Sequence, residues 1–237
     1  MKLSAPIYRL KRKAKELARK DDIPLHLALD RVAIGEGFGA WSLLAARSAE
    51  SLSAEGLLAW LEPGDLLLIG ARPGHGKTLL SLQLAVEAMK AGRRAVFFTL
   101  EYTARDVVGR FRALGVDPAQ FEALFSFDDS EAISADHIMR ALAEAPRGTL
   151  AIVDYLQLLD QKRCNAELAD QIRDLKAFAL ARGVILAFIT QIDRSYDPAA
   201  KPCPDLGDVR LPNPLDLSLF SKTCFLNEGE VRFQAAG

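Results

Sequence analysis

The sequence predicts an α/β protein with a mostly parallel sheet flanked by helices and an antiparallel hairpin near its C-terminal end. Strands that are buried on both faces read as nearly continuous apolar runs, and helices pack between successive parallel strands. The sequence alternates such runs with helical patterns from residue 65 onward. The predicted strands span residues 65–70, 94–100, 150–154 and 184–190.

Helical periodicity fills the segments between these runs, which supports the parallel arrangement. The predicted helices span residues 78–91, 103–114, 134–144 and 165–182. Near the end, "KTCFLNEGEVRF" predicts two short strands around Glu228–Gly229, a hairpin that adds antiparallel strands at a sheet edge. The polar, proline-rich stretch 193–216 is a long loop, and loops of this length in compact domains usually carry function or move.

Residues 1–50 predict a small basic helical unit, distinct from the α/β domain of residues 51–237. Residues 1–20 contain eight Lys or Arg and one acid, and apolar residues recur there at helical spacing. Pro24 suits the first turn of a second helix, and "AWSLLAAR" at 40–47 predicts a third. The basic face is either solvated or a contact for nucleic acid or protein, and the pattern leaves both open.

Composition narrows the class of protein without naming a function. The net charge of -1 over 237 residues indicates no overall preference for nucleic acid or membrane. The three cysteines are too scattered for a disulfide framework or a zinc site, and with three scattered histidines we expect no His/Cys metal site. No apolar run approaches the ~18 residues of a membrane span, and we expect a reduced cytoplasmic protein.

The stretch "GARPGHGKT" at 70–78 lies between a predicted strand and a predicted helix. Glycines at 74 and 76 let backbone N–H groups curl around phosphates, and the following helix presents its positive end. Lys77 supplies charge for the outer phosphates, and Thr78 supplies a hydroxyl for Mg²⁺. Ala71 replaces one glycine of the general pattern by the next smallest residue. The stretch predicts a nucleotide-binding loop.

Polar residues follow three other predicted strands. Asp154 ends "LAIVD", Glu101 follows "VFFTL" and Gln191 follows "LAFIT". Ligands of parallel sheets bind at the carboxyl ends of strands, so these side chains should meet the loop at one edge. Asp154 is then placed to hold the metal, Glu101 to deprotonate an attacking water, and Gln191 to sense a γ-phosphate. The alternative for Glu101 is a cap on the following helix.

Four segments together resemble the C-terminal ATPase domain of replicative DNA helicases of the DnaB type, which has a RecA-like fold. They are "LLLIGARPGHGKTLLSLQLA", "FFTLEYTARDVVGRF", "LAIVDYLQLL" and "FITQIDRS", and the resemblance covers roughly residues 56–237. The form "ARPxxGKT" is usual in that family, so Ala71 fits it.

The resemblance implies ATP and Mg²⁺ as ligands and assigns a role to each matching residue. Glu101 is the implied general base, with Lys77 and Gln191 also catalytic. Thr78 and Asp154 are the implied metal residues. The implied nucleotide contacts are Ala71, Arg72, Pro73, Gly74, His75, Gly76, Lys77, Thr78 and Leu79, together with Arg110. For Arg110, an ordinary surface arginine on a helix is the open alternative.

The resemblance also implies a homo-oligomer, with a hexamer as the family's form, whose channel loops contact single-stranded DNA. The loops after Asp154 and Gln191 correspond to those channel loops. Their basic residues, the candidate DNA contacts, are Lys162, Arg163, Arg194, Lys201 and Arg210.

Two departures from the family leave a second function open. Residues 1–50 are too short for the helicases' N-terminal domain, and the hairpin lacks their Lys-x-Arg pair, with Arg232 as the one arginine there. An arginine finger can contribute ~10³–10⁵ in rate. The alternatives are therefore a DNA-acting ATPase related to helicases, and a slow ATPase whose nucleotide state regulates a partner. A recombinase-type filament would need an N-terminal oligomerisation strand, which the sequence does not show.

Overall fold

The chain divides into two compact units, Met1–Gly56 and Leu57–Gly237. The computed structural model describes residues 4, 7–44, 53–121, 123–160, 165–201, 203–211, 213–227 and 230–235. The predicted turn at 228–229 lies outside these ranges, as do the candidate DNA contacts Lys162 and Arg163.

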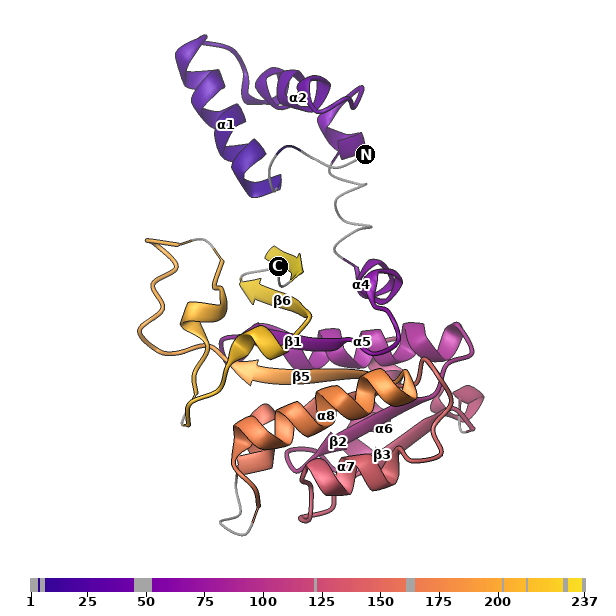
Figure 1. Cartoon of the computed structure of the whole chain (residues 1–237). Coiled ribbons are helices and arrows are strands. Elements are labelled where there is room, and N and C mark those ends of the chain that lie inside the picture. Colours follow the sequence, from indigo (N-terminus) through magenta and orange to yellow (C-terminus); the bar gives the residue numbers. More distant parts are fainter. Residues whose placement is uncertain are drawn as a thin grey trace. The chain divides into compact units, whose positions relative to one another are not determined.

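The second unit is built on one seven-stranded sheet of order β3-β2-β4-β5-β1-β6-β7 (Figure 1). All neighbouring strands are parallel except the last pair, β6 and β7, which is antiparallel. The strands are β1 (Leu66–Ala71), β2 (Ala95–Thr99), β3 (Phe125–Asp128), β4 (Leu150–Asp154), β5 (Ile185–Gln191), β6 (Lys222–Asn227) and β7 (Glu230–Ala235).

This topology confirms the predicted fold class and corrects some of its details. The four predicted apolar runs are β1, β2, β4 and β5. The hairpin forms, but β6 pairs with β1 in parallel, so only β7 is antiparallel to its neighbour. Strand β3 and helix α4 (Ala54–Trp60) were not predicted. Strand β3 has four residues, all half-buried, and therefore lacks the apolar run that marks the central strands.

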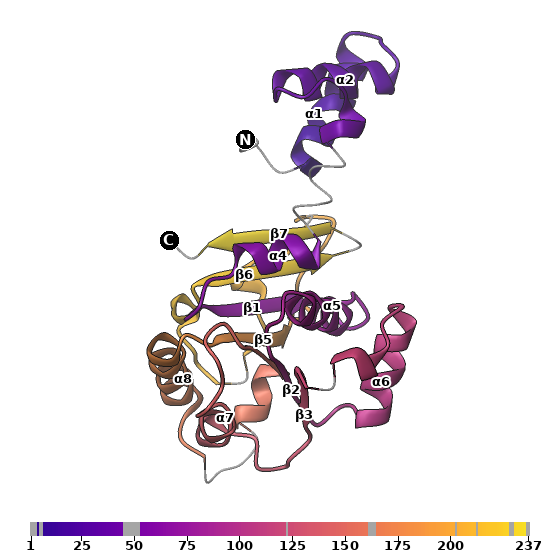
Figure 2. The same cartoon turned by 90° about the vertical axis from the view of Figure 1, so that its right-hand side faces the viewer.

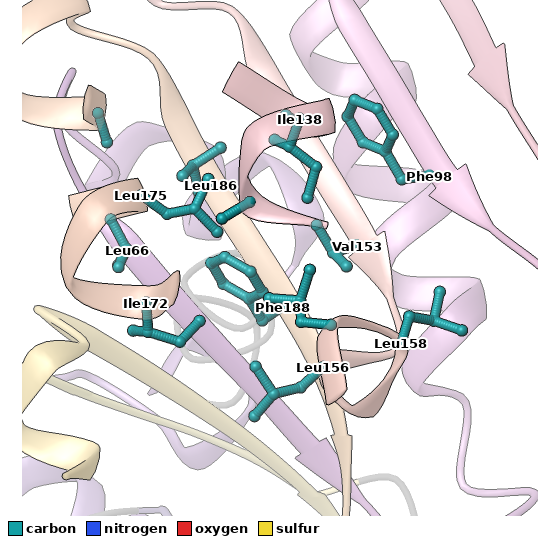
Figure 3. Packing of buried hydrophobic residues seen from close by; sticks show 14 of the residues in the cluster. Leu66, Phe98, Ile138, Val153, Leu156, Leu158, Ile172, Leu175, Leu186 and Phe188 are labelled. Carbon is teal, nitrogen blue, oxygen red and sulfur yellow. The ribbon is translucent and has the colours of Figure 1, made fainter. Parts of the chain in front are cut away.

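Helices cover both faces of the sheet (Figure 2). One face carries α5 (Lys77–Lys90) and α6 (Ala104–Ala113), and the other carries α7 (Ala135–Ala141) and α8 (Leu168–Arg182). Alternate strand residues such as Leu66, Val153 and Phe188 pack with α7 and α8 in one continuous core (Figure 3). Short 3₁₀ helices occupy η1 (Pro118–Phe121), η2 (Leu156–Asp160), η3 (Leu206–Asp208) and η4 (Leu217–Leu219).

The first unit has a small core of its own, formed by α1 (Ile7–Lys20), α2 (Leu25–Gly35) and helical residues 41–44. Residues 45–47 of the predicted third helix lie outside the described ranges. The buried residues of this core are Leu10, Ala14, Ala28, Val32, Ala33 and Leu44. Within the described ranges of the chain, we find no helix that combines the length and the apolar character needed to cross a bilayer.

Candidate functional site

The loop between β1 and α5 has the backbone of a phosphate cradle. Gly74 and Gly76 have φ angles of 80° and 84°, in the left-handed region that favours glycine. A Cβ added at either position would meet nothing within 4 Å, so the loop is open on that side. Helix α5 begins at Lys77, directly after Gly76, and no side chain caps its first amides among the described residues. Uncapped amides at a helix N-terminus favour an anion.

Ala71 and Gly70 at the loop entrance belong to β1. Ala71 is fully buried and lies in the ladder between Gln191 of β5 and Leu226 of β6, where its small side chain fits. Gly70 is paired with Phe225 of β6, and a Cβ on Gly70 would lie 2.6 Å from Cε1 of that ring. Glycine is therefore required at position 70 by close packing against Phe225. The sequence alone gave no sign of this contact.

Asp154 and Thr78 meet at the N-terminus of α5. The Thr78 hydroxyl donates to Oδ2 of Asp154 at 3.3 Å, and Asp154 is 1% exposed at the tip of β4. The other carboxylate oxygen, Oδ1, is buried, and no described residue donates a hydrogen bond to it. Burial and the nearby Glu101 carboxylate raise the pKa of Asp154 to about 7, while Lys77, Thr78 and Arg110 oppose this shift.

This pair fits a divalent cation. A buried carboxylate oxygen without a donor is costly, and a cation bound beside it would compensate that cost. A carboxylate and a hydroxyl are oxygen ligands of the kind that Mg²⁺ binds, together with water and phosphate oxygens. The same cation would favour the ionised form of Asp154, against the effect of burial.

Glu101 lies two residues beyond the end of β2, with its side chain exposed. Its backbone N–H donates to the Thr99 hydroxyl at 3.0 Å, and Thr99 pairs with Asp154 across the sheet. Thr103 caps α6, in a reciprocal capping box with Asp106. The helix cap is thus supplied by Thr103, and the Glu101 carboxylate lies close enough to Asp154 to raise its pKa.

Arg110 is held at the same edge by an aromatic contact. Its guanidinium carbon lies 4.4 Å from the centroid of the Tyr102 ring, and its charge acts on the Asp154 carboxylate. These contacts are compatible with the predicted role of Arg110 near the nucleotide, which stays a prediction. Tyr102, one residue after Glu101, joins the candidate site through this contact, which depends on how α6 packs and has no signal in the sequence.

Gln191 is the last residue of β5, beside Ala71 in the ladder. Its carbonyl oxygen accepts a hydrogen bond from the Arg210 N–H at 2.8 Å, and the next residue, Ile192, forms an antiparallel bridge with Val209. Gln157 of η2 donates to the Arg210 carbonyl at 3.0 Å. The end of β5 is thus hydrogen-bonded to residues 209–210 of the long loop.

The long loop after Gln191 has its own small core. The contacts within this loop determine which of its basic residues are free to contact a ligand. Lys201 forms ion pairs of 2.6 Å with both Asp205 and Asp208. The Tyr196 hydroxyl donates to the Lys201 carbonyl at 2.6 Å, and burial raises the pKa of Tyr196 to about 12. Arg194 and Arg210 are exposed. The charge of Lys201 is therefore balanced by ion pairs within the loop. Among the described residues, the two exposed arginines act on Asp193 through their charge without forming an ion pair.

The two remaining candidates are Arg232 and His75. Arg232 is half-buried on β7, opposite Phe225 of β6, and its charge acts on Asp205. His75 is half-buried within the phosphate loop, and its backbone N–H donates to the Arg72 carbonyl at 3.2 Å. The charges of Lys77, Glu101 and Arg110 and the hydrogen bond from Thr78 all act on the carboxylate of Asp154 at the end of β4.

Comparisons with known proteins place the chain in a family. The family model described as "ATPase: KaiC" matches residues 60–202, more than half of the chain. A probable plasmid replicative DNA helicase of Chlamydia trachomatis serovar L2 is 28% identical over 181 residues, which cover 63% of this chain and 40% of that protein. The replicative DNA helicase DnaB of Helicobacter pylori strain J99 is 26% identical over 178 residues, which cover 62% of this chain and 37% of that protein.

A solved ATPase domain has the same fold, with a TM-score of 0.58 at 19% identity over 79% of this chain and 81% of that one. These findings confirm the resemblance to DnaB-type helicases and the RecA-like fold. The chain spans about two fifths of the length of the curated relatives it matches. The chain therefore belongs to the KaiC ATPase family, and its second unit is a P-loop ATPase domain related to those of replicative DNA helicases.

Proposed function

We propose that the second unit binds ATP with Mg²⁺ and hydrolyses it at the edge of the sheet formed by β1, β2, β4 and β5. The observation that carries this proposal is the buried Asp154 carboxylate, whose Oδ1 has no donor among the described residues and whose Oδ2 accepts from Thr78. It lies beside a glycine loop and the uncapped start of α5. An anionic ligand and a cation together complete this arrangement.

Each side chain of the site has a separate role in this proposal. Lys77 and the loop amides bind the phosphates, and Thr78 and Asp154 hold the metal. Mg²⁺, when bound, neutralises charge on the phosphate oxygens. Glu101 orients a water molecule and accepts its proton. Arg110, fixed on Tyr102, adds positive charge near the nucleotide.

Gln191 transmits the presence of the outer phosphate to the loop that begins at residue 193. Its backbone is hydrogen-bonded to Arg210, so a shift at the end of β5 reaches the loop directly. The relatives are named replicative DNA helicases, which supports single-stranded DNA as the partner of this loop. Arg194 and Arg210 are the described residues best placed to contact phosphates there, since Lys201 is paired internally. A ring or other homo-oligomer would bring these loops together around one strand.

The test is the ATPase rate with and without single-stranded DNA at low salt, combined with molecular mass by light scattering in the presence of an ATP analogue. Low salt is needed because phosphate contacts weaken steeply as salt rises. Stimulation by DNA together with a mass of several protomers supports the DNA-acting ATPase. Hydrolysis that is slow and unchanged by DNA would instead support the alternative, a module that regulates a partner through its nucleotide state.

A further inference from the structure

We infer that the first unit is a nucleic-acid-binding module that holds a phosphate backbone on the basic face of α1. We define this basic face by Lys11, Lys15 and Arg19. The matched family model begins at residue 60, so the inference concerns a part of the chain that the model does not cover. It also does not depend on ATP hydrolysis by the second unit.

The basic face is a continuous row of exposed cations. Lys11, Lys15 and Arg19 follow one another at intervals of four residues, so they lie along one side of the helix with a rise of about 6 Å between them. All three are exposed, and among the described residues none of them forms an ion pair. Like charges at this spacing repel each other and destabilise a helix. A bound polyanion would reverse that effect.

The remaining charges on α1 do not neutralise the row. The one acidic residue of the helix, Glu16, is paired with Arg12 at 3.0 Å, and both side chains are exposed. Arg31 on α2 is paired with Asp21. The Glu36 carboxylate interacts with Lys13, on another side of α1, and accepts hydrogen bonds from Ser4. These local pairs leave the three central cations available.

The apolar side of α1 distinguishes nucleic acid from a membrane as the partner. An amphipathic helix that lies in a membrane surface must bury its apolar side among lipid chains. On α1 that side already forms the core of the unit, because Leu10 is 2% exposed and Ala14 is fully buried. Only the charged side of α1 is left for a partner. This side can attract lipid headgroups, but it has no apolar residues to insert into the bilayer.

The composition of the exposed side distinguishes nucleic acid from an acidic protein. Stable protein interfaces are centred on apolar or aromatic anchors surrounded by polar residues. Every exposed residue of α1 between residues 10 and 20 is charged. The large apolar residues described as exposed in this unit, Leu25, Leu27, Ile34 and Leu43, lie outside this part of α1. We therefore expect backbone contacts without sequence preference.

The experiment measures binding of the full chain, without nucleotide, to a fluorescein-labelled oligothymidylate and to a random duplex, by anisotropy over a series of salt concentrations. The variant combines Lys11→Gln, Lys15→Gln and Arg19→Gln, which keep good helix propensity. The matched control combines Lys90→Gln, Arg173→Gln and Arg182→Gln, three basic helix residues of the second unit that already have carboxylate partners. Both variants change the net charge equally.

We expect the α1 variant to bind the single strand roughly ten- to a hundredfold more weakly at about 0.1 M salt, and its salt slope to fall by about 2 because three phosphate contacts are lost. Its ATPase rate without DNA should equal that of the wild type. A variant with arginine at all three positions should retain binding, which separates loss of charge from misfolding. Equal weakening in the α1 variant and the control would overturn the inference.

A parallel arm uses vesicles of phosphatidylserine and phosphatidylcholine. Binding of the wild type to these vesicles that matches or exceeds binding to DNA would assign the basic face to membranes and overturn the inference. Because the measurements omit ATP, loss of ATPase activity would leave them interpretable. Failure of the proposed function and failure of this inference are therefore distinguishable.

Discussion

Gln157 donates a hydrogen bond from Nε2 to the carbonyl oxygen of Arg210, 3.0 Å away, and thereby joins η2 to the loop that follows β5. The same nitrogen lies 3.5 Å from the Thr190 hydroxyl, one residue before Gln191. Its Oε1 is buried and has no partner among the described residues. One amide thus contacts both the end of the proposed phosphate-sensing strand and the loop that follows this strand.

Gln157→Leu should therefore separate ATP hydrolysis from its response to DNA. Leucine fills a similar volume without donating to Arg210, so we expect the rate without DNA to stay within about twofold while stimulation by single-stranded DNA is lost. The matched control is Gln171→Leu. Gln171 also donates to backbone carbonyls, those of Leu159 and Ala166, but it lies on α8 and in the core. Each variant should lose roughly 1–3 kcal/mol of stability. If single-stranded DNA still stimulated hydrolysis by Gln157→Leu, the Gln157 amide would play no part in coupling hydrolysis to DNA.

Glu101→Gln should abolish most of the hydrolysis and leave nucleotide binding intact. The amide keeps the size of the side chain but cannot accept a proton from water, and general-base catalysis contributes ~10²–10⁴ in rate. Because Thr103 caps α6, the substitution should leave the free energy of unfolding almost unchanged. Single-turnover hydrolysis and MgATP affinity, measured on the same preparation, check this prediction. A fall in affinity that matched the fall in rate would mean that Glu101 acts in binding instead.

Lys222→Met should destabilise the second unit, because Lys222 and Asp65 form an ion pair of 2.6 Å with side chains only 12% and 13% exposed. Removing one partner of a buried pair costs about 3–5 kcal/mol. An exposed pair, Arg173 with Asp170, provides the control, and Arg173→Met should cost at most about 1 kcal/mol. Urea unfolding of both variants at neutral pH measures the difference.

The same pair predicts how stability depends on pH. Burial alone would raise the pKa of Asp65, but hydrogen bonds from Lys222, the Glu62 amide and Ser221 lower it below its usual value. An acid with a lowered folded-state pKa stabilises the protein above its unfolded pKa, and this contribution is lost as pH falls through the folded-state value. Asp65→Asn should therefore cost stability at pH 7 and much less in strong acid. If the loss of stability caused by Asp65→Asn did not change with pH, the Asp65–Lys222 ion pair would not be its cause.

Gly70→Ala tests the close packing at the entrance of the phosphate loop. The new Cβ would lie 2.6 Å from the Phe225 ring, and we expect a loss of about 1–3 kcal/mol in the free energy of unfolding. Gly109→Ala is the control, because Gly109 lies inside α6 and a Cβ there meets nothing within 4 Å. This second substitution should stabilise by about 0.5–1 kcal/mol. Equal effects of the two substitutions would show that the Gly70 contact is unimportant.

The parts of the fold that follow from local pattern could be predicted from the sequence. The four central strands are buried on both faces, so each appears as an apolar run, and each of the polar residues Asp154 and Gln191 ends one of them. Their meeting at one edge follows from parallel pairing alone. Strand β3 could not be predicted in this way, because its residues are half-buried and do not form an apolar run.

Features that depend on long-range contacts could not be predicted. The need for glycine at position 70 comes from Phe225 on a neighbouring strand, far along the chain. The contact of Arg110 with Tyr102 depends on how α6 leaves β2. Lys201 has the residue type of a DNA contact, and only the folded loop shows that Asp205 and Asp208 balance its charge.

If the loop before α5 binds MgATP, Lys77→Ala should weaken this binding, and isothermal titration calorimetry measures the affinity of the variant for MgATP. The Lys77 ammonium should contribute a charged interaction with phosphate, so the account predicts a loss of at least about tenfold in affinity. Lys90→Ala removes the same charge from the other end of α5, where Lys90 is paired with Glu87, and should leave the affinity unchanged. Equal affinity in Lys77→Ala and the wild type would contradict the account.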